Sequence, residues 1–189
     1  MLQEKGSATR RYDNDTNIHF TREFNAQVWI KSCLEREKII TEFRTEINGK
    51  AVVFDAVFIE NINKRNTTLT VLELKKDVVD LQMIYTKIFR MYPEAIAKTF
   101  GLPKSYELTF VGSSIEAQAE YFLDDLLLEN NLYPTKSGVL KKVVINFKTY
   151  EEILQEYFKR HNITDRQAKM VRNSYGLLSG HGDRMPWID

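Results

Sequence analysis

Three charged residues interrupt two apolar stretches of the sequence in a pattern that suits a metal ion. Asp55 lies in the run AVVFDAVFI, and Glu73 and Lys75 stand two positions apart in VLELKK. Because side chains alternate along a strand, Glu73 and Lys75 are predicted to point from one face, with Leu69 and Val71 behind them. If the two runs are neighbouring strands, the carboxylates of Asp55 and Glu73 lie close enough to share one cation.

Two adjacent carboxylates are typical ligands of Mg²⁺ or Mn²⁺, which complete their coordination with water and phosphate oxygens. The backbone carbonyl of Leu74 is a further candidate ligand. Lys75 is then placed to orient or deprotonate a metal-bound water, or to hold a phosphate oxygen. The alternative is that Glu73 and Lys75 lie on a solvated face, which is the commoner use of a Glu-x-Lys strand. The apolar neighbours argue against it, because buried charges are costly unless they are paired or metal-bound.

The elements that must position these residues follow from hydrophobic periodicity and turn signals. The first half of the pattern predicts a helix over 22–38, strands over 39–47 and 51–60 joined by a tight turn at Asn48-Gly49, a strand over 69–76 and a helix over 78–100 that is broken near Pro93. The second half predicts a strand over 105–113, a helix opened by a capping box at 113–116 and a strand over 139–147. Two further capping boxes, at Thr149 and Thr164, open helices that end near 161 and 178. This order predicts an α/β fold with a mixed central sheet sandwiched by helices.

The 189 residues suit one domain, with a polar arm over 1–20, a core over 21–148 and C-terminal helices and a tail over 149–189. A hydrophobic content of 43% is sufficient for a buried core and excludes global disorder. The N-terminal segment lacks an apolar signal-peptide region and no apolar run approaches a membrane span, so we expect a soluble, intracellular, cytoplasmic protein without a membrane partner. The net charge of +1 does not by itself indicate a class of binding partner.

Other chemistries lack their motifs. The three histidines are scattered, and the single cysteine, Cys33, lies in an apolar helix where packing explains it. Neither a nucleophile elbow nor a glycine-rich phosphate loop occurs, so a hydrolase triad and ATP- or dinucleotide-dependent reactions are not supported.

The order of a helix, Asp55 on the second strand, Glu73-Leu74-Lys75 on the third strand and a following helix resembles the PD-(D/E)xK phosphodiesterase superfamily. Phe54-Asp55 matches its "PD" position and Glu73-Leu74-Lys75 its "(D/E)xK" position. The resemblance covers about residues 22–115. Within it, the stretch from FDAVFI to VLELKK and the following helix is similar to RecB-like and NucS-like nucleases. It implies a restriction-endonuclease-like α-β-β-β-α-β core. The sequence departs from the pattern in lacking a proline before Asp55, and Gln82 and Tyr85 are one residue closer than in the Gln-x-x-x-Tyr of RecB-like members.

The resemblance also implies two further site residues. Such nucleases usually carry an acid on the first helix, and Glu23 is the candidate metal ligand, on a face shared with Gln27. The alternative for Glu23 is a first-turn acid favoured by the helix dipole. Gln82, with Tyr85 on the same helix face, would position substrate or metal-bound water. The alternative is a polar residue at the edge of the helix, with Tyr85 in the core.

These observations predict a Mg²⁺- or Mn²⁺-dependent nuclease acting on nucleic acid, with DNA as the expected substrate, and Asp55, Glu73, Lys75 and Gln82 as catalytic residues. Arg166, Lys169 and Arg172 recur at intervals of three and are candidate phosphate contacts, although basic stripes on helices are usually only solvated. The alternative function is a non-catalytic module of this fold that binds nucleic acid or a protein. A homodimer or a larger protein partner is left open.

Overall fold

A mixed five-stranded sheet forms the centre of the protein in the computed structural model, which describes residues 9–10, 23–33, 38–60, 68–103, 105–128, 133–140 and 143–170. The strands are β2 (Ile39–Ile47), β3 (Lys50–Glu60), β4 (Thr68–Leu74), β6 (Ser105–Gly112) and β10 (Val143–Thr149), in the spatial order β10-β6-β4-β3-β2. The β2, β3 and β4 strands are antiparallel neighbours, whereas β4, β6 and β10 run parallel. Asp55 therefore lies on β3 and Glu73 on β4, near the middle of the sheet, and Lys75 directly follows β4.

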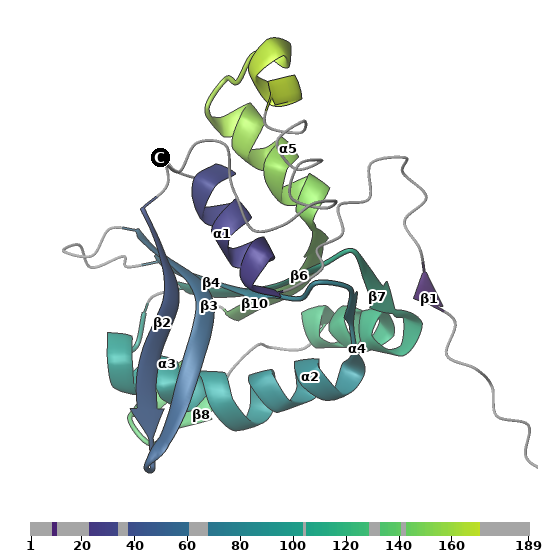
Figure 1. Cartoon of the computed structure of the whole chain (residues 1–189). Coiled ribbons are helices and arrows are strands. Elements are labelled where there is room, and N and C mark those ends of the chain that lie inside the picture. The colour runs from purple at the N-terminus through teal and green to yellow at the C-terminus, as the bar shows by residue number, and fades with distance from the viewer. Residues whose placement is uncertain are drawn as a thin grey trace, which may run out of the picture.

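Helices cover both faces of this sheet (Figure 1). One face carries α1 (Glu23–Cys33) and α5 (Tyr150–Arg160); the other carries α2 (Leu81–Thr86), the π-helical turn η1 (Lys87–Met91), α3 (Tyr92–Phe100) and α4 (Ala117–Leu128). Two smaller sheets join β1 (Thr9–Arg10), β7 (Ser114–Glu116) and β5 (Val78–Val79), and β8 (Tyr133–Thr135) with β9 (Gly138–Leu140). The predicted α/β class with a mixed sheet is confirmed. None of the described helices is long and apolar enough to cross a membrane.

The sheet divides the core into two apolar clusters, one on each face. Leu69 and Val71 of β4 belong to the cluster beneath α2, η1, α3 and α4, whereas Leu72 and Leu74 belong to the cluster beneath α1 and α5. This alternation places Glu73 on the same side as Leu69 and Val71, as the sequence predicts. The strand expected over 69–76 ends at Leu74, so Lys75 follows the strand, although its Nζ lies 3.8 Å from Glu73 Oε1. Glu73 is only 2% exposed, so the solvated-face alternative is wrong for this residue.

The hairpin between β2 and β3 is confirmed. Asn48 and Gly49 both have positive φ angles, of 50° and 76°, and Ile47 pairs directly with Lys50. A two-residue loop with two left-handed residues matches the twist of the flanking strands, and Gly at the second position adopts this conformation without steric cost. The turn thereby sets the register that places Asp55 on β3.

Three predicted elements differ from the structure. Ser113-Ser114-Ile115-Glu116 does not cap a helix: Ser114–Glu116 is strand β7, and the Ser113 hydroxyl donates to the Asp77 carbonyl. The helix expected over 78–100 begins only at Leu81, because Asp80 caps it by accepting from the Met83 N–H at 2.7 Å. The strand expected over 139–147 is split between β9 and β10. For β7, β9 and β10 a strand partner competes with the local pattern, whereas the start of α2 is set by its own cap at Asp80.

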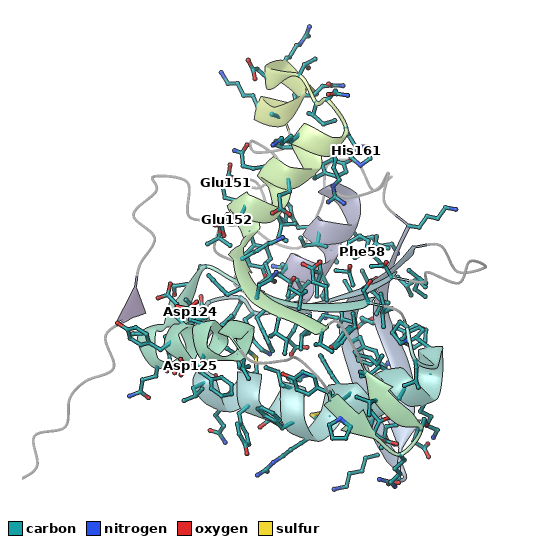
Figure 2. All side chains as sticks on the ribbon, turned by 180° about the vertical axis from the view of Figure 1, so that it is seen from behind. Phe58, Asp124, Asp125, Glu151, Glu152 and His161 are labelled. Atoms are coloured by element: carbon teal, nitrogen blue, oxygen red, sulfur yellow. The ribbon has the colours of Figure 1, made fainter. Side chains whose placement is uncertain are left out.

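The capping box at Thr149 is confirmed and carries a stability prediction. The Thr149 side chain accepts from the Glu152 N–H, and Glu152, which Figure 2 shows at the start of α5, accepts from the Thr149 N–H at 2.6 Å. We expect Thr149→Ala to lower the free energy of unfolding by about 1 kcal/mol, because a helix-end donor loses its acceptor. Thr149→Ser keeps the hydroxyl and is the matched control. Equal urea midpoints for Thr149→Ala and the wild type would contradict this.

Candidate functional site

Asp55 lies where the regular pairing of β3 is interrupted. Phe43 pairs with Phe54 and Thr41 with Ala56, but Asp55 has no registered partner on β2, where the opposing Glu42 has a φ of 50°. On the other side, the β3–β4 ladder ends at Ala56 and Leu72. Beyond this last pair, the Leu74 N–H of β4 points toward β3 and donates to Asp55 Oδ2 at 2.8 Å. The Asp55 carboxylate thus substitutes for a missing backbone acceptor and is held between the two strands.

The surroundings of Asp55 favour its neutral form. Burial and the nearby negative charge of Glu73 raise the pKa of Asp55 from 3.8 to about 6, with burial the larger cause. The Leu74 N–H, the positive charge of Lys87 and Gln27 of α1, whose Nε2 donates to Asp55 Oδ1 at 2.9 Å, lower the pKa in part. The two carboxylates are therefore close enough to repel each other, and the positive charge of Lys87 offsets this repulsion in part.

Glu73 is buried but fully engaged by polar side chains of η1 and α3. Lys87 Nζ lies 2.9 Å from Glu73 Oε1, and Lys75 Nζ lies 3.8 Å from the same oxygen. The Tyr92 hydroxyl donates to Glu73 Oε2 and accepts from Lys87 Nζ at 3.1 Å. Burial, followed by the charge of Glu73, raises the pKa of Tyr92 well above 10, so the hydroxyl keeps the proton it donates. Lys87, Tyr92 and Glu73 form a closed polar ring that fixes the carboxylate.

The backbone of Lys75 is anchored on both sides. Its N–H donates to the Val111 carbonyl of β6 at 2.7 Å, and its carbonyl accepts from the Tyr150 hydroxyl of α5 at 2.8 Å. The side chain is 26% exposed, compared with 3% for Glu73. The next residue, Lys76, is half exposed and pairs with Asp77 at 3.5 Å. Lys75 is thus the more accessible cation at Glu73, and Lys76 has no part in the cluster.

The donor set fits a divalent ion that is bound by two carboxylates and completed by other oxygens. Mg²⁺ and Mn²⁺ favour such sites, with water and substrate phosphate supplying the remaining ligands. Asp55 and Glu73 repel each other, and an ion between them would neutralise their negative charge. Within the described part of the chain, no group of three or more His, Cys, Asp or Glu side chains is arranged to hold a metal. The Leu74 carbonyl stays a prediction, since Leu74 joins the described site through its N–H.

The structure does not bring the other predicted residues to this cluster. Gln82 and Tyr85 are exposed on α2, where they line a shallow cavity with Phe122 of α4. Tyr85 is 47% exposed, so the alternative that placed it in the core is wrong. Glu23 is the first residue of α1, and the position of its side chain lies outside the described residues.

The predicted phosphate contacts are also remote from Asp55 and Glu73. Arg166 and Lys169 are exposed in a helical segment over 165–170, beyond the outer end of α5 (Figure 1). Its capping box is confirmed, because the Thr164 side chain accepts from the Gln167 N–H and Gln167 Oε1 from the Thr164 N–H. Arg172 lies outside the described residues.

The side of the sheet away from this segment carries the acidic residues Asp124 and Asp125 on α4 (Figure 2).

Sequence reasoning missed three site residues: Gln27, Lys87 and Tyr92. Gln27 was expected only to share a face of the first helix with Glu23. Lys87 and Tyr92 are five residues apart, which places them on different sides of an α-helix. In η1 the Tyr92 N–H bonds to the Lys87 carbonyl, an i→i+5 contact of the wider π-turn, and both side chains meet at Glu73. Periodicity could have found them only if the π-turn before Pro93 had been anticipated.

A cavity of about 670 Å³ lies apart from this cluster, between α5 and the sheet. Its lining includes Thr70, Glu107, Lys148 and Arg160. Comparisons with known proteins add no assignment: no protein-family model, curated protein or solved structure matches the chain. The chemistry that Asp55, Glu73 and Lys75 can perform together is therefore the guide to function.

Proposed function

We propose that the protein is a Mg²⁺- or Mn²⁺-dependent phosphodiesterase that cleaves nucleic acid, with DNA as the expected substrate. The observation that carries the proposal is the convergence of Asp55 and Glu73 from adjacent strands, with Lys75 in contact with Glu73. A buried, mutually repelling carboxylate pair is unfavourable for folding alone, which points to a role in binding a cation. The order α1, β2, β3, β4, the α2–α3 helical stretch and β6 supports a restriction-endonuclease-like core.

Each residue of the cluster has a distinct part in this proposal. When bound by Asp55 and Glu73, the ion would lower the pKa of a bound water and stabilise negative charge on the leaving oxygen. Gln27 and the Leu74 N–H hold the Asp55 carboxylate in place. Lys75 orients the attacking water or a phosphate oxygen, since its ammonium is partly exposed and its backbone is anchored to β6 and α5. Arg166 and Lys169 remain predicted DNA contacts.

A non-catalytic module of the same fold is the second candidate, and one observation favours it. Both oxygens of Glu73 are already engaged, Oε1 by Lys87 and Lys75 and Oε2 by Tyr92, and the side chain is almost fully buried. A buried ionic cluster of this kind also occurs as a purely structural feature. The cluster would then hold β4 against η1 and α3, and the nucleic acid or protein partner would bind elsewhere.

A cleavage assay separates the two candidates. We expect the wild type to cut single-stranded or duplex DNA in Mg²⁺ or Mn²⁺ and to stop in EDTA. Glu73→Gln should reduce the rate by about a thousandfold or more, because removing a charged ligand forfeits several kcal/mol of charge stabilisation. Glu107→Gln is the matched control, because it neutralises a carboxylate on β6 that bonds to Thr109 and Asn146, away from the site.

Two outcomes would count against catalysis at this site. Undiminished cleavage by folded Glu73→Gln protein would show that the carboxylate is not a ligand. Wild-type protein that is folded yet inert on DNA and RNA in both metals would favour the binding module.

A further inference from the structure

Lys87 is the closest cation to the buried carboxylate of the candidate site, and no sequence motif marks it. Its Nζ is 2.9 Å from Glu73 Oε1, whereas that of Lys75 is 3.8 Å from the same oxygen. Lys87 Nζ also donates to the Tyr92 hydroxyl and lies 4.9 Å from the centre of the Tyr92 ring. The ammonium is thus held by a charge, a hydroxyl and an aromatic face at once.

The position of Lys87 follows from the cost of burying Glu73. A carboxylate removed from water needs a counter-charge and hydrogen bonds to both of its oxygens. Lys87 provides the charge at Oε1, and Tyr92 provides the hydrogen bond at Oε2. Lys87 also acts on the second carboxylate, because its positive charge lowers the pKa of Asp55. It is therefore a counter-ion for the pair.

We propose that Lys87 is the resident counter-ion of the Asp55–Glu73 pair and competes with a divalent ion for the same negative charge. This inference rests on the proposed function, since it concerns the metal of that site. Two cations at one carboxylate oxygen repel each other, so binding of the ion weakens the contact between Lys87 and Glu73. The Lys87 side chain is 19% exposed and has a long flexible stem, which lets its ammonium turn toward a bound phosphate group. The site then keeps its fold without metal and gains a phosphate-binding cation with it.

The test measures metal affinity and metal-free stability, which do not depend on turnover. Calorimetric Mn²⁺ titrations at pH 7 should show Lys87→Met binding about tenfold tighter than the wild type, because a repelling charge is gone. Lys87→Arg keeps the charge and should stay close to the wild-type affinity. Lys76→Met removes the same net charge from an exposed position and should also match the wild type.

Thermal unfolding provides the second readout. In EDTA, Lys87→Met should melt several degrees below the wild type, because Glu73 loses its counter-ion, and saturating Mn²⁺ should raise its midpoint more than that of the wild type. Should Lys87→Met fail to fold, Lys87→Gln provides a neutral donor that can still bond to Glu73. It should show the same tightening of Mn²⁺ binding.

The outcomes distinguish failure of this inference from failure of the proposed function. Equal Mn²⁺ affinity in the wild type, Lys87→Met and Lys87→Gln would overturn the competition and leave the metal site in place. If Mn²⁺ bound to Lys87→Met but not to the wild type, Lys87 would be shown to exclude the ion, and the competition would be supported. Absence of Mn²⁺ binding from every variant would overturn both the competition and the metal-dependent phosphodiesterase.

Discussion

Asp55→Asn is expected to make the protein more stable at pH 7 while abolishing cleavage. The wild-type Asp55 carboxyl has a pKa of about 6 in the folded protein, compared with 3.8 for an unperturbed aspartate. At pH 7 the group is ionised in both states, but its charge is less favourable in the folded state because of burial and of Glu73. Asparagine has nearly the same shape and lacks this charge. We expect a gain of roughly 1–2 kcal/mol, since one pKa unit corresponds to about 1.4 kcal/mol and Asn keeps only part of the hydrogen bonding.

The pH dependence of this effect has a definite sign. Below about pH 4 both states of the wild type are protonated at Asp55, so the penalty is absent. Between about pH 4 and 6 the unfolded chain loses this proton first, and the wild type therefore loses stability as the pH rises. Above pH 6 the penalty is complete. The stability difference between Asp55→Asn and the wild type should accordingly grow from about pH 4 to 6 and then level off.

Urea unfolding of both proteins from pH 4 to 7.5 in EDTA measures this difference, and the cleavage assay measures the loss of function. Gln27→Leu provides an informative comparison, because it removes a hydrogen bond to Asp55 while keeping the carboxylate. It should raise the pKa of Asp55 further and retain part of the activity. A less stable Asp55→Asn at pH 7 would contradict the raised pKa, and an active one would contradict the role as a ligand.

Lys75→Ala is expected to abolish turnover while leaving Mn²⁺ binding nearly unchanged. Lys75 contacts Glu73 at 3.8 Å and is the more exposed cation of the cluster, and we propose that it acts on substrate and does not bind the metal. We expect a fall in single-turnover rate of about a hundredfold or more, which is typical for loss of an acid–base or orienting group. Mn²⁺ affinity should stay constant or rise slightly, because one positive charge has left the site.

Two variants test whether this effect is specific to Lys75. Lys75→Arg should not restore the rate, because a planar guanidinium neither deprotonates nor replaces a compact ammonium. Lys76→Ala should be almost silent, since Lys76 is half exposed and pairs with Asp77 at the surface. Single-turnover cleavage beside calorimetric Mn²⁺ titration measures both quantities. Equal damage from Lys76→Ala and Lys75→Ala would contradict the strand alternation that defines the site.

The sequence by itself determined the parts of the site that depend on neighbouring residues in the chain. Strand alternation places Glu73 on the face of Leu69 and Val71, because the period of a strand is two. Lys75 directly follows β4, and its ammonium still lies beside Glu73. Asn48-Gly49 sets the hairpin register locally, since only a tight turn with two positive φ angles joins β2 and β3 without extra residues. The apolar runs around Asp55 and Glu73 indicated buried strands, and Glu73 is indeed buried.

Only the tertiary structure decided which side chains meet these carboxylates. Gln27 contacts Asp55 from α1, and Lys87 and Tyr92 contact Glu73 from η1 and α3. None of these contacts follows from local periodicity, because each joins segments far apart in the sequence and one depends on a π-turn. The same reason explains why the predicted helix cap at Ser113 is wrong. The Ser113 hydroxyl donates to the Asp77 carbonyl, next to the pairing of β5 with β7. Local patterns determine which face a side chain occupies, whereas the burial of charge determines which distant partners it must have.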